Sequence, residues 1–228
     1  MAFSARPPSS DRRPDFDSRR VRLIAAAIRA GQASADVAFD AAFPVELRDV
    51  SAHYWTPVRV VRLAATWLRE TRARTVIDIG SGAGKFCVAA ALLTRCRFTG
   101  LEHRASLVSA ARDLAVTFGV ADRVTFVYGG IEAAGTMDAE AYYLFNPFGE
   151  YTFSSARFAD PDVTFSTGSQ QRDIAATAAL LSRARPGTFV ITYNGFGGSV
   201  PQSYEQIDVA TRLPGTLRLW KKREDGVS

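Results

Sequence analysis

The sequence has few cysteines and no long apolar run, and these shortages exclude several classes of protein. Its 228 residues include two cysteines, Cys87 and Cys96. Two are too few for a disulfide framework, so we expect two buried thiols and a reducing, cytoplasmic location. No run approaches the roughly 18 apolar residues of a membrane span. Residues 1–15 lack the apolar centre of a secretory signal, so we expect a flexible lead there and no membrane segment.

The charge balance is mildly basic. The net charge is +5, and arginines in the first thirty residues supply much of the surplus. A basic stretch near a terminus is typical of a solvated arm. We therefore give nucleic acid low weight as a partner. The sequence is silent on the oligomeric state.

The N-terminal part predicts helices. Residues 17–31 place Val21, Ile24 and Ile28 on one helical face, and Pro57 opens a second amphipathic helix over residues 57–72. Residues 33–56 show few periodic signals. We expect three parts: a lead over 1–15, a helical arm or lid over 16–56, and a main domain over 57–228.

From residue 75 onward, apolar strands alternate with helices. This alternation predicts a doubly wound, mostly parallel seven-stranded α/β sheet with helices on both faces. Two strand-like runs that follow residue 203 are close enough for an antiparallel C-terminal hairpin. The expected strands span 75–80, 97–102, 124–129, 139–146, 187–194, 204–211 and 216–223, and the expected helices span 85–95, about 107–118 and 171–184.

A glycine-rich loop follows the first expected strand. The run VIDIGSGAGKF has Gly80, Gly82 and Gly84 at the carboxyl end of that strand, where ligands bind in open α/β sheets. Glycines let the backbone approach a ligand, and the start of the next helix offers free amides. The spacing does not fit the dinucleotide fingerprint, and no Walker sequence is present. Asp78 would repel a pyrophosphate and attract a cationic ligand.

A second acid closes the next strand. Glu102 follows an apolar strand, which favours a buried position over a surface one. At a strand end, a carboxylate can accept both hydroxyls of an adenosine ribose.

These motifs together resemble those of class I S-adenosylmethionine-dependent methyltransferases. TVIDIGSGAGKF, FTGLE, VTFVYGGI and LFNPF stand in that family's order, and the resemblance covers about residues 57–223. It implies a Rossmann-like fold with S-adenosyl-L-methionine as cofactor and no metal. It also implies that Asp78 and the loop backbone hold the methionine moiety, that Glu102 holds the ribose and that His103 lies along the adenine. The loop residues are Gly80, Ser81, Gly82 and Gly84.

The sequence departs from the family after the third expected strand. The family often has an aspartate there that faces the adenine amino group, but this chain has Gly129, Gly130, Ile131 and Glu132. We expect backbone groups at Gly130 and Ile131 to contact the adenine, or Glu132 to take the role of the aspartate.

The fourth expected strand ends in FNPFGE. By resemblance to the Asn-Pro-Pro-aromatic motif of amino-group methyltransferases, Asn146 and the Pro147 carbonyl would accept hydrogens from an amine, and Asn146 would also contact the cofactor. The chain has one proline where that motif has two. Phe148 would stack on the acceptor or the sulfonium. Glu150 or Tyr193 could serve as a base.

Two further segments are expected near the cofactor. His53, Tyr54 and Trp55 could form a lid, with Tyr54 and Thr56 touching the cofactor, although a packing cluster is an equal alternative. Asn194 and the glycines after it could border the acceptor pocket.

The sequence thus predicts a methyltransferase acting on a nitrogen of a protein side chain or a small molecule. Two alternatives stay open. One is a nicotinamide-dinucleotide-dependent oxidoreductase, which the loop spacing disfavours. The other is a non-catalytic nucleoside-binding homologue, which the absent aspartate and second proline would support.

Overall fold

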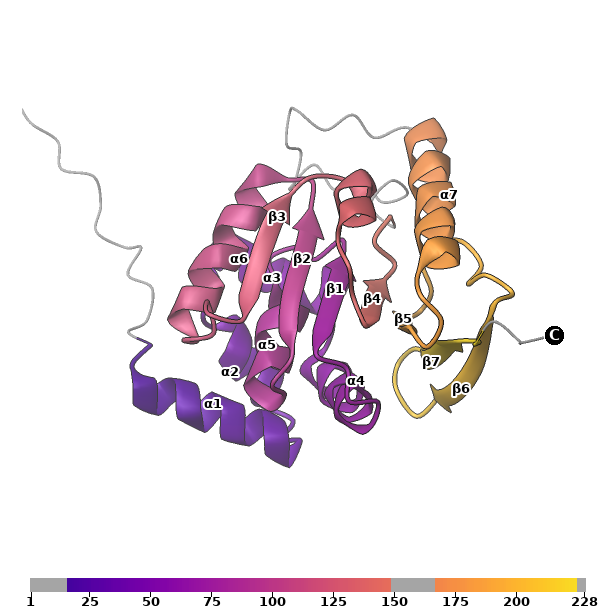
Figure 1. Cartoon of the computed structure of the whole chain (residues 1–228). Coiled ribbons are helices and arrows are strands. Elements are labelled where there is room, and N and C mark those ends of the chain that lie inside the picture. Colours follow the sequence, from indigo (N-terminus) through magenta and orange to yellow (C-terminus); the bar gives the residue numbers. More distant parts are fainter. Residues whose placement is uncertain (1–15, 149–166, 225–228) are drawn as a thin grey trace, which may run out of the picture.

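The computed structural model describes residues 16–148 and 167–224 (Figure 1). In chain order the elements are α1 (Ser18–Ala30), α2 (Ala35–Asp40), α3 (Val45–Tyr54), α4 (Val58–Glu70), β1 (Thr75–Ile79), α5 (Lys85–Leu93), β2 (Arg97–Glu102), α6 (Ala105–Thr117), β3 (Val124–Tyr128), the 3₁₀ helix η1 (Ile131–Thr136), β4 (Ala141–Phe145), α7 (Thr167–Arg183), β5 (Phe189–Tyr193), β6 (Tyr204–Ala210) and β7 (Leu217–Lys222).

The strands of the described residues form one seven-stranded sheet in the order β3-β2-β1-β4-β5-β7-β6. The first five in this order are parallel, and β7 pairs antiparallel with both β5 and β6. The register places Asp78 of β1 beside Gly100 of β2 and Tyr143 of β4. The predicted sheet with its antiparallel C-terminal hairpin is confirmed.

Side chains that alternate along β1 enter two separate hydrophobic clusters. Val76 belongs to the cluster that includes residues of α1 to α6. Ile77 and Ile79 belong to the other cluster, with Leu180 and Leu181 of α7. Helices therefore lie on both faces, as predicted, but unevenly: α7 and η1 are on one face and α1 to α6 on the other (Figure 1).

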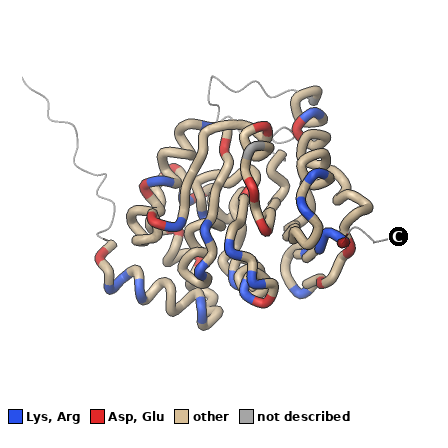
Figure 2. Tube along the Cα trace, viewed as in Figure 1, with Lys and Arg blue, Asp and Glu red and all other residues tan. Residues whose placement is uncertain are grey.

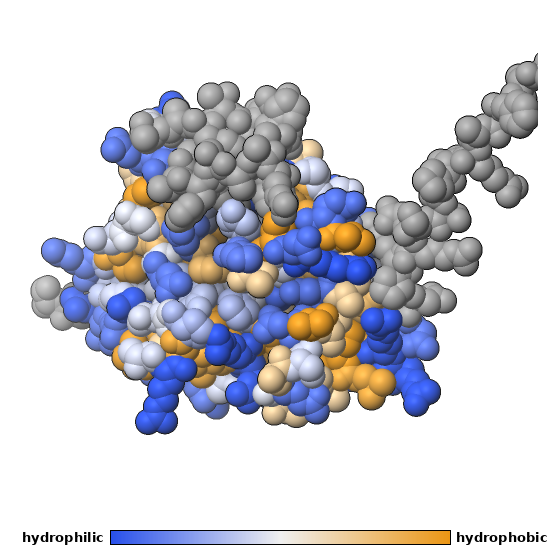
Figure 3. Space-filling model, turned by 180° about the vertical axis from the view of Figure 1, so that it is seen from behind, coloured by the Kyte–Doolittle hydropathy of each residue, from blue (hydrophilic) through white to orange (hydrophobic). Residues whose placement is uncertain are grey.

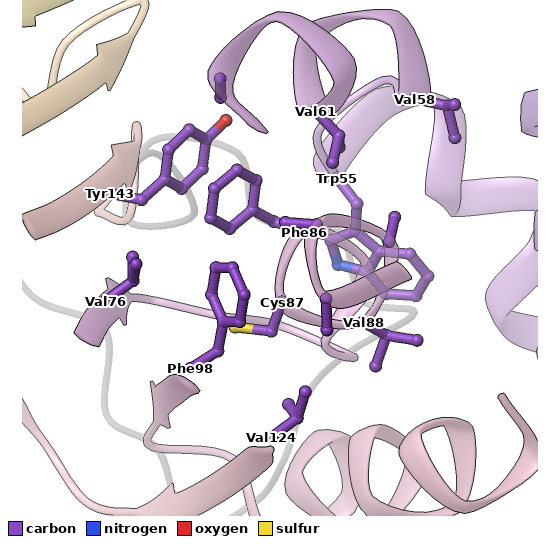
Figure 4. Packing of buried hydrophobic residues seen from close by; sticks show 14 of the residues in the cluster. Trp55, Val58, Val61, Val76, Phe86, Cys87, Val88, Phe98, Val124 and Tyr143 are labelled. Carbon is purple, nitrogen blue, oxygen red and sulfur yellow. The ribbon is translucent and has the colours of Figure 1, made fainter. Parts of the chain in front are cut away.

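An aromatic stack fixes α5 on the sheet. Phe86 of α5 lies over Tyr143 of β4, with ring centroids 3.5 Å apart and ring planes at 7° (Figure 4). Phe98 of β2 meets Phe86 edge-on, with centroids 6.1 Å apart. Aromatic side chains bury large apolar areas, and such pairs add to that stabilisation. Because α5 begins directly after the glycine loop, the stack also fixes where that loop ends.

Local signals explain the two predicted N-terminal helices. The side chain of Asp17 accepts a hydrogen bond from the Arg20 amide at 2.7 Å and caps α1. Gly31, with φ of 68°, ends the helix. Pro57 immediately precedes α4, a position that needs no amide donor. Both helices are where the sequence predicts them.

The segment from 33 to 56, part of the predicted helical arm, holds the two helices α2 and α3, whose bounds the sequence did not indicate. Phe39 of α2 is fully buried and stacks on Phe118, at the end of α6, with ring centroids 4.5 Å apart. Phe43 packs on Trp55 with centroids 4.7 Å apart. α2 has six residues, too few for a stable isolated helix, so tertiary contacts must support it.

The surface carries few large apolar groups. Seen from behind, hydrophobic and hydrophilic residues are interspersed (Figure 3). At one edge of the sheet, β6 is exposed from Glu205 to Val209 and has an irregular register between Gln206 and Asp208. Among the described residues, every helix is too short or too polar to cross a membrane.

The buried contact of α2 gives a stability prediction. Phe39→Ala should lower the free energy of unfolding by about 3–5 kcal/mol, because it removes a fully buried ring and leaves a cavity. Leu23→Ala is the control, since Leu23 is 62% exposed and should change stability by less than about 0.5 kcal/mol. Urea denaturation followed by circular dichroism measures both. Equal stabilities of the two variants would contradict the packing of α2 on α6.

Candidate functional site

A pocket of about 290 Å³ lies where β1, β2 and β4 end. In this sheet order the chain leaves β1 toward β2 on one side, and β4 lies on the other, so the pocket is at the switch point of the topology. Its lining residues come from the end of α3, the glycine loop, the end of β2 and the end of β4: His53, Tyr54, Trp55, Gly80, Gly82, Glu102, His103, Arg104, Phe145, Asn146 and Pro147.

Close packing explains the glycines of the loop. Gly80 and Gly82 have positive φ values of 74° and 54°. A Cβ atom at Gly80 would lie 2.5 Å from the Pro147 Cβ, and one at Gly82 would lie 2.6 Å from the Trp55 Nε1. Side chains at these two positions would therefore strain the backbone and displace its neighbours.

The loop amides are largely engaged within the protein. The amides of Gly80 and Ser81 donate to the same β2 carbonyl oxygen, at 3.0 and 2.8 Å. The Gly82 amide donates to Glu102 Oε2 at 3.0 Å, and the Gly84 amide donates to the Ser81 carbonyl at 2.9 Å. These four loop amides are therefore already engaged, and the expectation of free amides at the start of the next helix concerns other residues. The main contribution of the loop to ligand binding is then its lack of side chains, which allows a ligand to approach the backbone closely.

Glu102 is buried at the pocket wall, as predicted. It is 3% exposed. Its Oε1 accepts from the backbone amide and the Nε of Arg104, at 3.0 and 3.1 Å. The His103 Nδ1 lies 3.5 Å from the same oxygen. A carboxylate has about four acceptor sites, so this arrangement orients Glu102 and leaves it capacity for further donors.

Asp78 is also buried, but its surroundings differ. It faces α5, and the Cys87 thiol donates to Asp78 Oδ2 at 3.3 Å. Burial, aided by the nearby charge of Glu102, raises the pKa of Asp78 to about 7, although the thiol contact opposes the shift. An ionised Asp78 is therefore unfavourable here unless a cation lies close to it.

A second, smaller hollow of about 20 Å³ adjoins the pocket beside Asp78. The two spaces share lining residues Tyr54, Trp55, Gly80 and Phe145. The Ser81 side chain lines the hollow, and its buried Oγ has no hydrogen-bond partner among the described residues. Such an unpaired polar atom is unfavourable, and a ligand could relieve it.

The end of β4 splits into two environments. Asn146, with φ of 39°, and Pro147 line the pocket. Phe148 is 8% exposed and packs in the hydrophobic cluster on the α7 side, away from the pocket-lining set. The expectation that Phe148 stacks on an acceptor therefore does not match its position. Glu150 lies outside the described residues.

Tyr193 ends β5, beside Phe145 of β4 in the same sheet, and Asn194 follows it. The Tyr193 ring packs on Phe145 with centroids 4.7 Å apart, and burial raises its pKa, which makes it a poorer base at neutral pH. The Asn194 Oδ1 accepts from the Thr216 amide at 2.9 Å, which ties β5 to the hairpin turn. Neither residue is in the pocket-lining set, contrary to their expected roles.

Gly130 and Ile131 are also absent from the pocket lining. Ile131 is 8% exposed within the cluster on the α7 side. The Gly130 amide donates to Glu132 Oε1 at 3.1 Å, so this carboxylate folds back on its own turn. The segment still begins beside the pocket, because the Gly129 amide donates to the Glu102 carbonyl at 3.1 Å.

The end of α3 contributes one wall of the pocket. His53, Tyr54 and Trp55 line it together. Thr56 lines the smaller hollow and shares a hydrogen bond of 2.8 Å with the Tyr143 hydroxyl. Trp55 is buried and packs against the glycine loop at Gly82. In this structure the segment is therefore a closed wall of the pocket.

Sequence reasoning missed Arg104, Phe145 and Lys85. Arg104 is 4% exposed, and its guanidinium faces Glu102 inside the pocket lining. The side chain of Lys85 is 1% exposed and contacts acids of α2. The sequence did hold one indication of the role of Lys85: a lysine in the first turn of a helix is unfavourable because of the helix dipole, so acidic partners are expected near it.

No cluster of three or more His, Cys, Asp or Glu side chains within residues 16–148 and 167–224 could hold a metal ion. Cys87 and Cys96 are both buried free thiols, as predicted.

No protein-family model and no curated protein sequence matches the chain, but solved structures match its fold. An RNA methyltransferase from Salinibacter ruber in complex with S-adenosyl-L-homocysteine is 22% identical, with a TM-score of 0.53 over 75% of this chain and 95% of that one. An O-methyltransferase from Bacillus cereus in complex with SAH is 12% identical, with a TM-score of 0.54 over 90% of this chain and 92% of that one. At these identities the likeness shows the fold, which is the Rossmann-like fold of class I methyltransferases.

The raised pKa of Asp78 predicts a pH-dependent stability. The folded chain holds this proton up to about pH 7, whereas an unfolded aspartate loses it near pH 4. Stability is therefore lost as the pH rises between these values. Asp78→Asn should be more stable than the wild type by about 2–4 kcal/mol at pH 8, since each pKa unit corresponds to about 1.4 kcal/mol. The advantage should shrink toward pH 4.

Denaturant titrations at several pH values measure this difference. Asp122→Asn is the control, because the Asp122 side chain is 73% exposed. A wild type that matches or exceeds the stability of Asp78→Asn at pH 8 would contradict the burial of an ionisable Asp78.

Proposed function

We propose that the chain is an S-adenosyl-L-methionine-dependent methyltransferase. One observation carries the proposal: two buried carboxylates lie beside a glycine loop at the switch point of a methyltransferase fold. Glu102 lines the pocket of about 290 Å³, and Asp78 lines the smaller hollow that adjoins it. Side chains at Gly80 or Gly82 would clash with Pro147 or Trp55. In solved structures of that fold, S-adenosyl-L-homocysteine is named as the bound molecule. A dinucleotide-dependent oxidoreductase is a weaker proposal, because a pyrophosphate would lie near both acids.

The residues present fit this cofactor. Asp78 would ionise to pair with its cationic amino-acid end, and Glu102 has acceptor capacity for the ribose hydroxyls. The pocket volume of about 290 Å³ is just below the range of about 300–1,000 Å³ for ligand sites, and the adjoining hollow adds about 20 Å³. His103 would lie along the adenine. Tyr54 and the loop would enclose the sulfonium, which aromatic faces attract.

Asn146 and Pro147 are the proposed acceptor-binding residues. Bound cofactor supplies an electrophilic methyl group, and the protein has to hold the acceptor in line with it. Asn146 and the Pro147 carbonyl could accept hydrogens from an amine and direct its lone pair into the pocket. Phe148 would support this turn from the core, where it packs. A nitrogen acceptor is the form of the proposal that these oxygens favour.

The acceptor itself is proposed to be a small molecule or a protein side chain. Arginines gather on α1 and at the edge where β1 and β2 begin, including exposed Arg72, Arg74, Arg95 and Arg97 (Figure 2). That edge is opposite the pocket, so these charges are badly placed to hold a nucleic acid against the proposed site. Incubating cell lysate with the enzyme and a donor labelled on the methyl group, then separating protein, nucleic acid and small molecules, identifies the acceptor class.

Cofactor binding can be tested at Glu102. Glu102→Gln should weaken the binding of S-adenosyl-L-homocysteine about tenfold to a hundredfold, because hydrogen bonds to a charged group contribute about 1.5–3 kcal/mol. Glu140→Gln is the matched control, since Glu140 lies at the opposite edge of the sheet and pairs with Arg74. Isothermal titration calorimetry measures all three proteins. A wild type that binds NADH and not S-adenosyl-L-homocysteine would refute the proposal.

Acceptor positioning can be tested at Asn146. Asn146→Ala should lower the rate of methyl transfer about a hundredfold, the scale expected for a misplaced reactant, and leave S-adenosyl-L-homocysteine affinity within about threefold. Asn194→Ala is the control: Asn194 also has a positive φ, of 57°, but is outside the pocket lining. Initial rates with the labelled donor and the active lysate fraction give the comparison. Equal losses in both variants would argue against a role for Asn146.

A further inference from the structure

Lys85 occupies an unfavourable position for a cation. It is the first residue of α5, directly after the glycine loop. The N-terminus of a helix carries partial positive charge, which disfavours an ammonium there. The side chain is also only 1% exposed, and burial of an ammonium requires compensation. A lysine at this position therefore needs hydrogen-bonding and acidic partners that compensate its charge.

Those partners all come from the N-terminal arm. The Lys85 Nζ lies 2.9 Å from Asp36 Oδ1 and 2.8 Å from Asp40 Oδ1, one turn apart on α2. It also donates to the Ser51 Oγ of α3 at 2.9 Å. Burial raises the pKa of Asp40 even against the effect of the ammonium, so Lys85 and Asp40 are largely withdrawn from water. The Asp36 side chain is 38% exposed and forms the outer part of this group.

The same contacts enclose the segment that lines the pocket. Ser51 precedes His53–Trp55, and its carbonyl accepts from the Trp55 amide at 3.0 Å. After that segment, the Val58 amide donates to Asp36 Oδ1 at 2.9 Å. Lys85 therefore joins both flanks of His53–Trp55 through side chains that it contacts directly. Between them, the Trp55 indole packs on Gly82, so closely that a Cβ at Gly82 would lie 2.6 Å from its Nε1.

We propose that Lys85 is a positioning residue that seats the His53–Trp55 wall on the glycine loop and thereby shapes the ligand pocket. The seating stands on the contacts of the chain itself, and only its effect on cofactor affinity rests on the proposed function. A lysine that merely stabilised the fold would not need to hold the pocket wall from both sides. Its loss would then lower stability without moving Trp55 relative to the loop.

The experiment uses full-length protein labelled with 5-fluorotryptophan. The chain has three tryptophans, so the fluorine spectrum should show three resonances, assigned with Trp55→Phe, Trp67→Phe and Trp220→Phe. The test variants are Lys85→Met and the neutral triple variant Asp36→Asn/Asp40→Asn/Lys85→Met. The triple variant leaves no buried charge without a partner, so it should fold even where the single variant does not. Arg74→Met is the matched control, because Arg74 is in an exposed ion pair with Glu140 and lies outside the pocket lining.

In the ligand-free triple variant, the Trp55 resonance should shift or broaden while those of Trp67 and Trp220 stay in place. Its affinity for S-adenosyl-L-homocysteine should fall at least tenfold. The control should leave both measurements unchanged. A triple variant with an unshifted Trp55 resonance, or with wild-type affinity, would overturn the proposal. If wild-type protein does not bind S-adenosyl-L-homocysteine at all, the proposed function is wrong. The position of the Trp55 resonance in the triple variant then tests by itself whether Lys85 holds the His53–Trp55 wall on the glycine loop.

Discussion

Buried charged side chains lie around the glycine loop, and each needs a partner of opposite charge or a hydrogen-bond donor or acceptor. These pairings fix the positions of the residues that line the site. Glu102 is compensated by Arg104 and by a loop amide, and Lys85 by the acids of α2. Asp78 accepts a hydrogen bond from the Cys87 thiol, a weak and uncharged donor. An ionised carboxylate in such surroundings is unfavourable until a cation joins it. The same burial that destabilises ionised Asp78 in the free chain would therefore contribute selectivity for a positively charged ligand.

The N-terminal arm is part of this arrangement. Residues of α1, α2 and α3 share one hydrophobic cluster with α5 and α6. The contact between Phe39 and Phe118 joins parts of the chain that are far apart in sequence. A boundary at residue 56 consequently divides side chains that pack together. A lid that opens freely would have to break this cluster, whereas a fixed wall does not.

Regular patterns in the sequence predicted the sheet, the glycine loop and the burial of Glu102, because apolar strands and glycine spacing follow from local geometry. Other features depend on partners that are distant in sequence. The helix α2 is stabilised by α6, and the pairing of Lys85 with Asp40 spans 45 residues. The separation of Asn146 from Phe148 depends on a turn with φ of 39° at Asn146, which no periodic pattern encodes. The amides of Gly80, Ser81 and Gly82 donate to groups of β2, and the Gly84 amide donates to Ser81, contacts that the glycine spacing does not indicate.

The exposed strand β6 has a consequence beyond the site. An edge strand presents unpaired backbone groups that can recruit a strand from another molecule. Here Ile207 and Val209 are 45% and 43% exposed. On a regular edge strand, such exposed apolar side chains would favour association with another molecule. The irregular register next to Ile207, with Glu205 and Asp208 on the same strand, interrupts any continuous ladder that a neighbour could extend. This irregularity would hinder a neighbouring molecule from extending the sheet at β6.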